Sequence, residues 1–346
     1  MGVDLVTWPE LFGLGGIVIL SALASAGLIV VLRPLLARYA MARPNARSSH
    51  KIPTPQGGGI AVLAATLLTT ALILLVRPGF GRDVIVEFGL VAAASVALAI
   101  LGAIDDIYPL DALPRLLVQF LAAAIIVASL PPDMQIVPVV PLWAERLLLI
   151  LAGVWFINLV NFMDGIDWMT VAEVVPITAG LLLLTLFGAL PPLAALIALT
   201  LLGAMIGFAP FNRPVARLFL GDVGSLPIGL LLCWLLLQLA IRGHLAAALL
   251  LPLYYVADTT LVLIRRTLNG EPITQAHRSH FYQRATERGF TVMDVVVRVF
   301  ATNVVLVVLA TVTVMTPSLI AAIAALALGA ALVAWLLVSF ARGARR

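Results

Sequence analysis

The sequence predicts an all-α polytopic integral membrane protein. Of its 346 residues, 62% are hydrophobic and only 11% are charged, whereas a soluble domain has roughly 25% charged residues. The mean hydropathy is +1.13, and long apolar runs recur from one end of the chain to the other. Most of these runs approach the ~20 residues that a helix needs to cross a bilayer, so we expect about 10–11 transmembrane helices.

Short polar connections separate the apolar runs. Residues 1–10 carry two acids and no basic residue, unlike the positively charged start of a cleavable signal peptide, so we expect the first span to be retained. Two runs are short and leave the number of spans open by one. The runs cover about residues 11–32, 57–76, 84–104, 116–130, 147–160, 170–187, 193–212, 223–241, 245–264, 299–316 and 318–340.

Basic residues are distributed unequally between the two sides of the expected membrane. With eleven spans, 17 of the 21 lysines and arginines fall on the side that holds the C-terminus. The positive-inside rule assigns that side to the cytoplasm and the N-terminus to the outside. The net charge of +4 follows from this bias and suits anionic lipid headgroups rather than nucleic acid. The single Cys233 excludes a disulfide framework.

Five polar segments fall on the expected cytoplasmic side. The loops on the opposite side are mostly short and lack clustered carboxylates. Ordinary solvated loop residues without a function explain this difference between the two sides poorly. We expect one transmembrane domain over residues 1–346, with its functional loops at about 33–56, 103–115, 158–170, 210–224 and 265–298.

Asp105 and Asp106 end an apolar span directly. Adjacent like charges at a membrane boundary are costly unless a cation, a phosphate-bound metal or water compensates them. The simpler alternative is a helix end that frays into the interface, where water would solvate both carboxylates.

Four residues recur at a spacing of three in the third of these segments: Asn158, Asn161, Asp164 and Asp167. Residues three apart share a face of a helical turn, so these side chains can converge on a hard cation or a nucleotide. Gly165 would loosen the helix where such a ligand approaches.

Asp222 lies between Gly221 and Gly224, at the start of an apolar run. Free N–H groups at a helix start favour a bound phosphate, and the carboxylate can hold a metal that bridges to that phosphate. The carboxylate can equally cap a helix that begins near Gly224, and the two interpretations are compatible.

Lys51 is the only lysine of the chain and precedes a proline-containing segment and the glycine run 57–59. We expect this run to let the backbone approach a ligand closely, although a solvated loop lysine is the alternative for Lys51. In the last polar segment, His277, Arg278 and His280 group two imidazoles around a guanidinium. They are a suitable clamp for a diphosphate, although this spacing also arises by chance.

Gathered on one face, these segments suit phosphoryl-group transfer. Two phosphorylated reactants repel each other until a divalent cation and basic side chains neutralise their oxygens. Mg²⁺ prefers the oxygen ligands found here. A site at the membrane boundary can take one reactant from the cytosol and the other from the lipid phase.

These motifs resemble those of the polyprenyl-phosphate N-acetylhexosamine-1-phosphate transferases, a superfamily that includes the bacterial MurNAc-pentapeptide and GlcNAc-1-phosphate transferases. The resemblance covers about residues 43–285 and five segments in the family order, namely HKIPTPQGGG, the acidic pair at 105–106, NLVNFMDGID, FLGDVGSLPIG and AHRSH. It implies a multi-pass enzyme of the bacterial inner (cytoplasmic) membrane with an active site that faces the cytoplasm.

The resemblance also implies a reaction. An N-acetylhexosamine-1-phosphate would pass from a UDP-N-acetyl amino sugar to undecaprenyl phosphate, which gives a polyprenyl-diphosphate-sugar and UMP. Mg²⁺ is the implied cofactor, with Mn²⁺ as an alternative. Membrane lipid is an implied partner, and a homodimer is compatible with the family.

Matching motif positions imply roles for individual residues. Asp222 and Asn161 would be metal ligands, and Asp105, Asp106 and Asp164 would be catalytic. The implied substrate-binding residues are Lys51, Asn158, Asp167, His277, Arg278 and His280.

The chain departs from the family pattern at two places. HRSHFYQRA replaces the histidine runs of the muramyl-peptide and enterobacterial GlcNAc branches, and it resembles the branch that initiates O-antigen or other surface polysaccharides. The lysine commonly found after the acidic pair is missing, and Arg115 is the nearest cation.

Two mechanisms remain open at this point. Polyprenyl phosphate, oriented or deprotonated by Asp105 or Asp106, can attack the β-phosphorus of the UDP-sugar directly. Alternatively, an aspartate acts as the nucleophile and forms a phosphoryl-enzyme intermediate.

Two other classes of protein fit less well. An ion-coupled transporter usually has ionisable groups near the membrane midplane, whereas the expected spans contain only Glu87, Glu173 and Asp258. A CDP-alcohol phosphotransferase needs an Ala-Arg pair after its first Asp-Gly, and this chain has Ile166 and Asp167 after Gly165.

Overall fold

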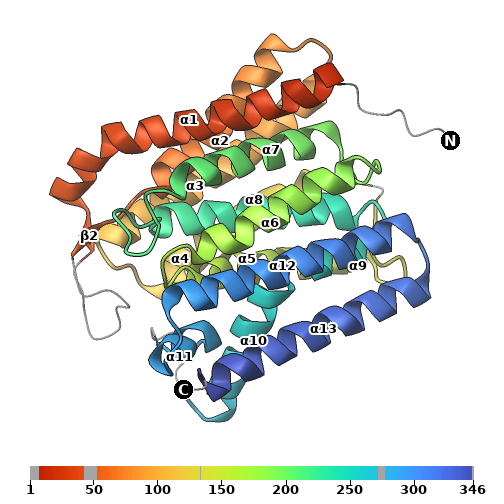
Figure 1. Cartoon of the computed structure of the whole chain (residues 1–346). Coiled ribbons are helices and arrows are strands. Elements are labelled where there is room, and N and C mark those ends of the chain that lie inside the picture. Colours follow the sequence, from red (N-terminus) through yellow and green to blue (C-terminus); the bar gives the residue numbers. More distant parts are fainter. Residues whose placement is uncertain (1–7, 43–52, 133, 272–276, 345–346) are drawn as a thin grey trace.

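The computed structural model describes residues 8–42, 53–132, 134–271 and 277–344, and these residues form thirteen helices and two short strands (Figure 1). The strands, β1 (Met41–Ala42) and β2 (Thr54–Pro55), pair antiparallel. The helices are α1 (Trp8–Tyr39), α2 (Gly59–Val76), α3 (Arg82–Ile107), α4 (Ala112–Ala128), α5 (Leu142–Met163), α6 (Met169–Thr185), α7 (Pro192–Phe208), α8 (Asp222–Ala240), α9 (Leu245–Leu250), α10 (Leu253–Leu268), α11 (Phe281–Glu287), α12 (Val292–Met315) and α13 (Leu319–Arg342).

The fold class is confirmed as an all-α polytopic membrane protein. In the described part of the chain, 7 helices are long and apolar enough to cross a membrane, namely α1, α2, α3, α5, α8, α12 and α13. The shorter apolar helices α4, α6 and α7 coincide with three more of the predicted runs.

One predicted span is divided in two. The run 245–264 forms α9 and α10, and the chain turns at Leu251 and Pro252 between them. A proline lacks the N–H of a helical hydrogen bond and clashes with the carbonyl four residues earlier. This break sets the start of α10, which carries Asp258 towards the last polar loop.

Helix α12 begins before the predicted apolar run. Thr291 accepts a hydrogen bond from the backbone N–H of Asp294, and the Asp294 carboxylate accepts one from the backbone N–H of Thr291. This capping box satisfies two donors of the helix start, so the helix extends beyond the apolar run to Val292.

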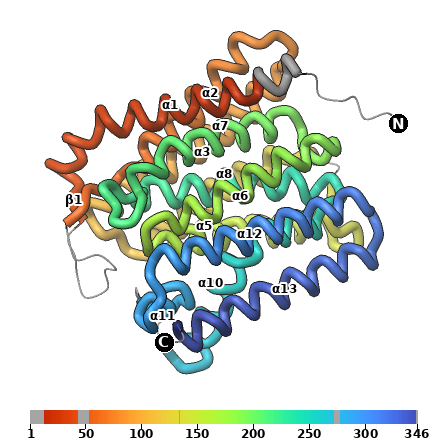
Figure 2. Tube along the Cα trace, viewed as in Figure 1, coloured from red at the N-terminus to blue at the C-terminus, as the bar shows by residue number. Residues whose placement is uncertain are grey.

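Helix α8 forms the centre of the bundle (Figure 2). Every residue from Val223 to Ala240 is buried, and α2, α3, α5 and α9 pack around the helix. A helix that is apolar on all sides is stable only when other helices cover it. The N-terminus of α8 therefore stays fixed where Asp222 begins the helix.

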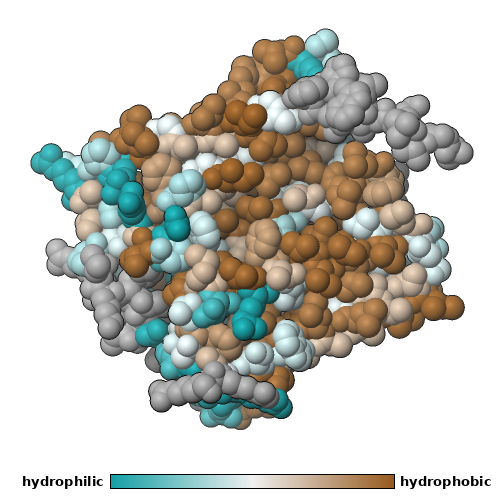
Figure 3. Space-filling view, viewed as in Figure 1, coloured by the Kyte–Doolittle hydropathy of each residue, from teal (hydrophilic) through white to brown (hydrophobic). Residues whose placement is uncertain are grey.

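The surface of the bundle is apolar over a broad belt and polar towards one end (Figure 3). Leu75, Leu319 and Ile320 are exposed to 83%, 77% and 82%, which indicates contact with lipid rather than water. Figures 1 and 2 show β1, α11 and the end of α13 at the same end of the bundle.

Candidate active site

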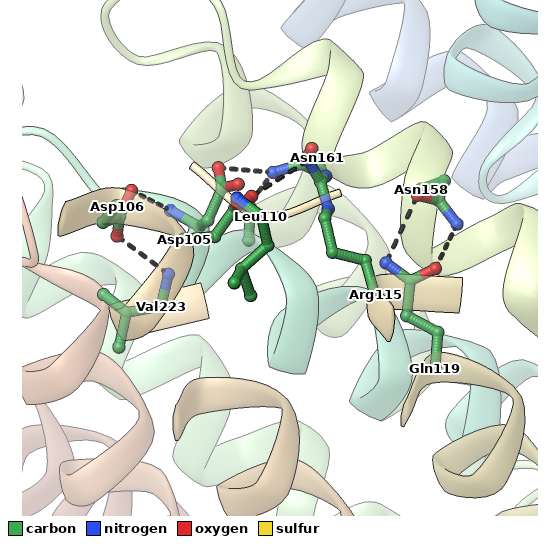
Figure 4. A network of polar contacts seen from close by, with 10 residues as sticks. Asp105, Asp106, Leu110, Arg115, Gln119, Asn158, Asn161 and Val223 are labelled. Atoms are coloured by element: carbon green, nitrogen blue, oxygen red, sulfur yellow. Dashed lines mark hydrogen bonds and ion pairs between the residues drawn. The ribbon is translucent and has the colours of Figure 1, made fainter. Parts of the chain in front are cut away.

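Three of the predicted loops meet at the Asp106 side chain and backbone (Figure 4). Both carboxylate oxygens of Asp106 accept hydrogen bonds of 3.1 Å, one from the backbone N–H of Asp222 and one from that of Val223. The side-chain amide of Gln56 donates to the Asp106 carbonyl at 2.8 Å. The end of α3, the start of α8 and the segment after β2 are therefore held together.

The glycine run approaches the backbone of its own chain. The backbone N–H groups of Gly58 and Gly59 donate to the carbonyls of Phe219 and Leu220, both at 2.9 Å. A Cβ atom on Gly59 would lie 2.1 Å from the Cα of Gly224. The expected close approach thus occurs between two loops of the protein, and it fixes the start of α8.

Asp105 is anchored beside a cation. Its Oδ1 accepts a hydrogen bond of 2.7 Å from the backbone N–H of Leu110, and its Oδ2 lies 2.9 Å from a guanidinium nitrogen of Arg115. Arg115, the cation nearest to the acidic pair in the sequence, therefore forms an ion pair with Asp105.

Asn161 and Asp222 are in direct contact. The Asn161 amide donates to Asp222 Oδ1 at 2.7 Å and to Ser225 Oγ at 2.9 Å. The Asp222 side chain does not cap α8, because Gly221 occupies the N-cap with a φ of 78°. The capping alternative is wrong, and the Asp222 carboxylate faces α5 instead.

Asp164 follows α5 and lies near the other acids. Burial raises the pKa of Asp164 to about 8, and repulsion from Asp222 and Asp106 adds to this effect, although the Thr170 hydroxyl donates a hydrogen bond to the carboxylate. Repulsion between acids indicates a local excess of negative charge.

The oxygen-rich donors suit a hard cation. Asp222, Asn161 and Ser225 carry oxygen atoms within one cluster, and the surrounding carboxylates exceed the charge that Arg115 supplies. Among the described residues, no group of three or more His, Cys, Asp or Glu side chains is arranged to hold a metal. This set fits Mg²⁺, which commonly takes one or two carboxylates and completes its shell with water and substrate phosphates.

A cavity of about 610 Å³ adjoins this cluster. Its polar residues are Arg115, Asn158, Asn161, Asp222, His277 and His280. Apolar residues form the remaining wall, and all but Leu110 belong to α4, α5 and α10, namely Leu110, Ala112, Leu116, Leu151, Val154, Trp155, Phe162 and Leu263. The cavity therefore joins the acidic cluster to an apolar surface between three helices.

Asn158 is fixed by a residue that the sequence did not reveal. Its amide donates to Gln119 Oε1 at 2.6 Å and to the Val154 carbonyl at 2.8 Å, while Gln119 donates back at 3.3 Å (Figure 4). Gln119 was the one amide in the apolar run 116–130, which is the only signal that could have identified it.

Asp167 and Gly165 lie beside the cluster but do not border the cavity. The Asp167 carboxylate accepts a hydrogen bond of 2.9 Å from the backbone N–H of Ala216, which links the end of α5 to the loop before α8. A Cβ atom on Gly165 would lie 2.0 Å from the Tyr282 hydroxyl. Gly165 thus makes room for Tyr282, whose hydroxyl donates to the Phe162 carbonyl at 3.0 Å.

The last loop brings two of its three predicted residues to the cavity. His277 and His280 border the cavity and stack with ring centroids 4.9 Å apart. Arg278 does not border it, because its guanidinium points towards Glu287, 3.6 Å away. Burial, followed by the nearby His280 and Arg266, lowers the pKa of His277 to about 4. Lys51 lies outside the described residues.

Comparison with known proteins identifies the family. The pattern of glycosyl transferase family 4 matches residues 88–240. A decaprenyl-phosphate N-acetylglucosaminephosphotransferase of Mycobacterium tuberculosis (strain ATCC 25618 / H37Rv) is 31% identical in an alignment of 295 residues that covers 75% of this chain and 72% of the relative. The chain belongs to glycosyl transferase family 4.

Other relatives of this family 4 protein carry related names. A probable undecaprenyl-phosphate N-acetylglucosaminyl 1-phosphate transferase of Bacillus subtilis (strain 168) is 24% identical over 79% of this chain and 78% of the relative. A phospho-N-acetylmuramoyl-pentapeptide-transferase of Enterococcus faecalis (strain ATCC 700802 / V583) is 28% identical over 63% and 70% of the two chains. The resemblance to the polyprenyl-phosphate hexosamine-phosphate transferases is therefore confirmed.

Proposed function

We propose that this family 4 protein transfers an N-acetylhexosamine-1-phosphate from a UDP-sugar to undecaprenyl phosphate and releases UMP. The observation that carries the proposal is the cavity that joins Asp222 and Asn161 to an apolar wall. One end suits phosphates and a cation, and the other suits a hydrocarbon chain. The names of the relatives support the same reaction.

The apolar wall suits the polyprenyl chain of the acceptor. Leu116 of α4, Trp155 of α5 and Leu263 of α10 border the cavity, so a chain could lie between these helices in contact with the bilayer. Arg115 also borders the cavity and is suited to bind the acceptor phosphate, since a guanidinium pairs with two phosphate oxygens at once.

We propose Mg²⁺ as the cofactor, held by Asp222 and Asn161, with Mn²⁺ as a substitute. When bound, the cation would neutralise diphosphate oxygens and so favour departure of UMP. The excess of carboxylates around Asp222 supports a cation there, because closely placed negative charges repel one another unless a positive charge neutralises them.

We infer that the acceptor attacks the donor directly. An oxygen of polyprenyl phosphate forms a bond to the β-phosphorus, the bond from the β-phosphorus to the bridging oxygen breaks, and that oxygen leaves with UMP. A phosphate monoester has a second pKa of about 6 and is mostly dianionic at pH 7. Asp105 and Asp106 therefore need only orient the acceptor, with Arg115 beside them. A labelled covalent adduct formed without acceptor would contradict this mechanism.

The product is proposed to start an O-antigen or another surface polysaccharide. The support is the last loop, where HRSHFYQRA differs from the histidine runs of other branches. We place the protein in the bacterial inner membrane with its site towards the cytoplasm, because 17 of the 21 basic residues lie on that side of the predicted topology; such a bias marks cytoplasmic loops.

The test measures UMP release in detergent with Mg²⁺, undecaprenyl phosphate and a panel of UDP-N-acetylhexosamines. We expect release that requires both lipid and metal and that Asp222→Asn lowers by about 100-fold or more. Asp83→Asn is the matched control, because Asp83 is exposed in the first turn of α3, and this variant should retain wild-type activity. No UMP with any donor, from folded protein, would overturn the proposal.

A further inference from the structure

Asp258 is a fully buried carboxylate in α10 that has no role in the site described so far. Its relative exposure is 0%, and it lies in an otherwise apolar run. A buried carboxylate is strongly destabilising unless several hydrogen bonds or a counter-charge compensate it. A carboxylate at this position therefore needs a specific partner that compensates its charge.

Four donors converge on this carboxylate. Oδ1 lies 3.1 Å from His280 Nδ1 and accepts from the backbone N–H of Phe281 at 3.1 Å. Oδ2 accepts from the backbone N–H of Tyr282 at 3.3 Å and from the Tyr254 hydroxyl at 3.4 Å. Each oxygen faces a backbone N–H, which can only donate, so the arrangement suits the ionised carboxylate.

The contact with Asp258 determines which nitrogen of His280 carries the proton. An acceptor opposite Nδ1 requires a proton on that nitrogen, which leaves Nε2 as the free ring nitrogen. His280 borders the cavity together with Asp222 and Asn161. Its side chain is only 3% exposed, so the ring has little freedom to turn.

Two further contacts restrain the ring. It stacks between His277 and Tyr282, with centroid distances of 4.9 and 5.8 Å. Tyr282 is itself tied to the end of α5, because its hydroxyl donates to the Phe162 carbonyl at 3.0 Å. Asn161 is the residue before Phe162, so the network connects Asp258, His280 and the proposed metal ligand.

We propose that Asp258 is a positioning residue, which holds His280 with Nδ1–H towards α10 and leaves Nε2 free to accept a hydrogen bond from a hydroxyl group of the UDP-sugar. This proposal rests on the proposed function for its substrate, but the orientation of the ring can be measured without any substrate. Asp258 acts through His280 and does not itself border the cavity.

The variant Asp258→Asn separates this role from simple burial. An asparagine offers one acceptor oxygen and an NH₂ group that only donates. The NH₂ group can lie opposite either His280 Nδ1 or the Tyr254 hydroxyl. Where it lies opposite Nδ1, that atom becomes the acceptor, and the proton moves to Nε2. Nε2 then donates a hydrogen bond instead of accepting one.

Glu145→Gln is the matched control. Glu145 is 4% exposed, and its carboxylate accepts from two consecutive backbone N–H groups, those of Ile136 and Val137, at 3.1 and 2.7 Å. It resembles Asp258 in burial and in its two backbone donors, but no histidine among the described residues forms a hydrogen bond or ion pair with it. Loss of stability from a missing carboxylate should be similar in both variants.

The first experiment records the ring ¹⁵N shifts of the full-length protein labelled only at histidine. The chain contains 4 histidines, His50, His244, His277 and His280, and His280→Gln assigns the signals of His280. We expect the Nδ1–H form in the wild type and in Glu145→Gln, and a shift to the Nε2–H form in Asp258→Asn. An unchanged His280 signal in Asp258→Leu, which removes both acceptor oxygens and so leaves Nδ1–H without its partner, would overturn the proposal, whether or not the protein proves to be a transferase.

The second experiment measures kinetics with the donor that releases UMP. We expect Asp258→Asn to lower kcat by about 10- to 100-fold, as for partners that orient a ligand side chain, while Glu145→Gln stays within about 2-fold of the wild type, as for a change remote from the site. The double variant Asp258→Asn/His280→Gln should be no slower than His280→Gln alone, because Asp258 acts only through His280 and both changes remove the same function. Fully additive losses would overturn the proposal.

Discussion

At the scale of single residues, the site depends on polar side chains that fix one another across helices. Asn158 borders the cavity, and its amide is held by Gln119 of α4 through hydrogen bonds of 2.6 and 3.3 Å. Asp105 is held by Arg115 in the same way. Such pairs keep a polar group in one orientation before the substrate arrives, which lowers the cost of binding it.

Gln119→Leu should therefore lower both stability and activity. Loss of Gln119 leaves the Asn158 oxygen without its donor, which costs about 1–3 kcal/mol of unfolding free energy, and kcat/KM should fall as Asn158 loses its orientation. The double variant Gln119→Leu/Asn158→Leu should recover stability but not activity. Thermal unfolding and UMP release measure the two effects, and a fully active single variant would contradict this role.

His277 should make the stability of the protein depend on pH. Its folded-state pKa is lowered to about 4 from the usual histidine value of 6.5, so the unfolded chain binds more protons between these two values. The contribution of neutral His277 to the free energy of unfolding is then fully present above about pH 6.5 and is lost as the pH falls towards 4. His277→Gln should unfold at a temperature that falls less steeply over this range. Equal slopes for both proteins would contradict the shift.

The sequence identified most residues that meet at the cavity, but not their partners. Asn158, Asn161, Asp222 and the last-loop histidines stand out because polar groups are rare near apolar spans. Gln119 lies in an apolar run and pairs with a residue 39 positions away, and no local pattern encodes that separation. For Arg278, the motif gave the residue but not the direction in which its side chain points.

At the scale of secondary structure elements, backbone contacts between loops set the geometry of the site. Gly59 and Gly224 are in van der Waals contact, and a Cβ atom on Gly102 would lie 2.3 Å from the Asp222 carbonyl. Helices α2, α3 and α8 therefore approach one another at positions where only glycine fits. The start of α8 is fixed by these contacts rather than by a ligand.

Gly59→Ala should destabilise the protein and displace Asp222. The added Cβ would lie 2.1 Å from a backbone atom, which cannot rotate away as a side chain can, so we expect a loss of about 1–3 kcal/mol or more. Gly89→Ala is the control, since nothing lies within 4 Å of a Cβ there. Thermal unfolding and UMP release should both fall in the first variant only. A stable and active Gly59→Ala would contradict the packing.

Helix positions were predicted well because apolar runs and membrane thickness determine them. The division of 245–264 into α9 and α10 was missed, although Pro252 lies in that run, because prolines are common in membrane helices and do not always end them. The start of α12 was placed too late because its first two turns carry Asp294 and Arg298 rather than apolar residues only.

At the scale of the whole molecule, the odd number of predicted spans puts the two ends of the chain on opposite sides of the membrane. Helix α1 begins at one end of the bundle, and α13 ends at the other, beside α11 (Figure 1). The backbone N–H of Ala344 donates to the Arg288 carbonyl at 3.1 Å, which holds the end of α13 on the side of the last polar loop.

Cysteine labelling in intact cells tests the predicted orientation. The natural Cys233 is buried and should not react. We expect an impermeant maleimide to label Pro78→Cys in intact cells and Asn269→Cys only in opened cells, because the two exposed positions fall on opposite sides of the predicted topology. The reverse pattern would contradict a cytoplasmic site.

The most direct test of the proposed reaction follows the two phosphorus atoms of the donor. UDP-sugar is labelled with ³²P at either the α- or the β-phosphorus and incubated with enzyme, Mg²⁺ and undecaprenyl phosphate. Transfer of a sugar-1-phosphate predicts that the β-label passes into the lipid extract while the α-label stays in water as UMP. Recovery of the β-label in water as UDP, with only the sugar on the lipid, would contradict the account.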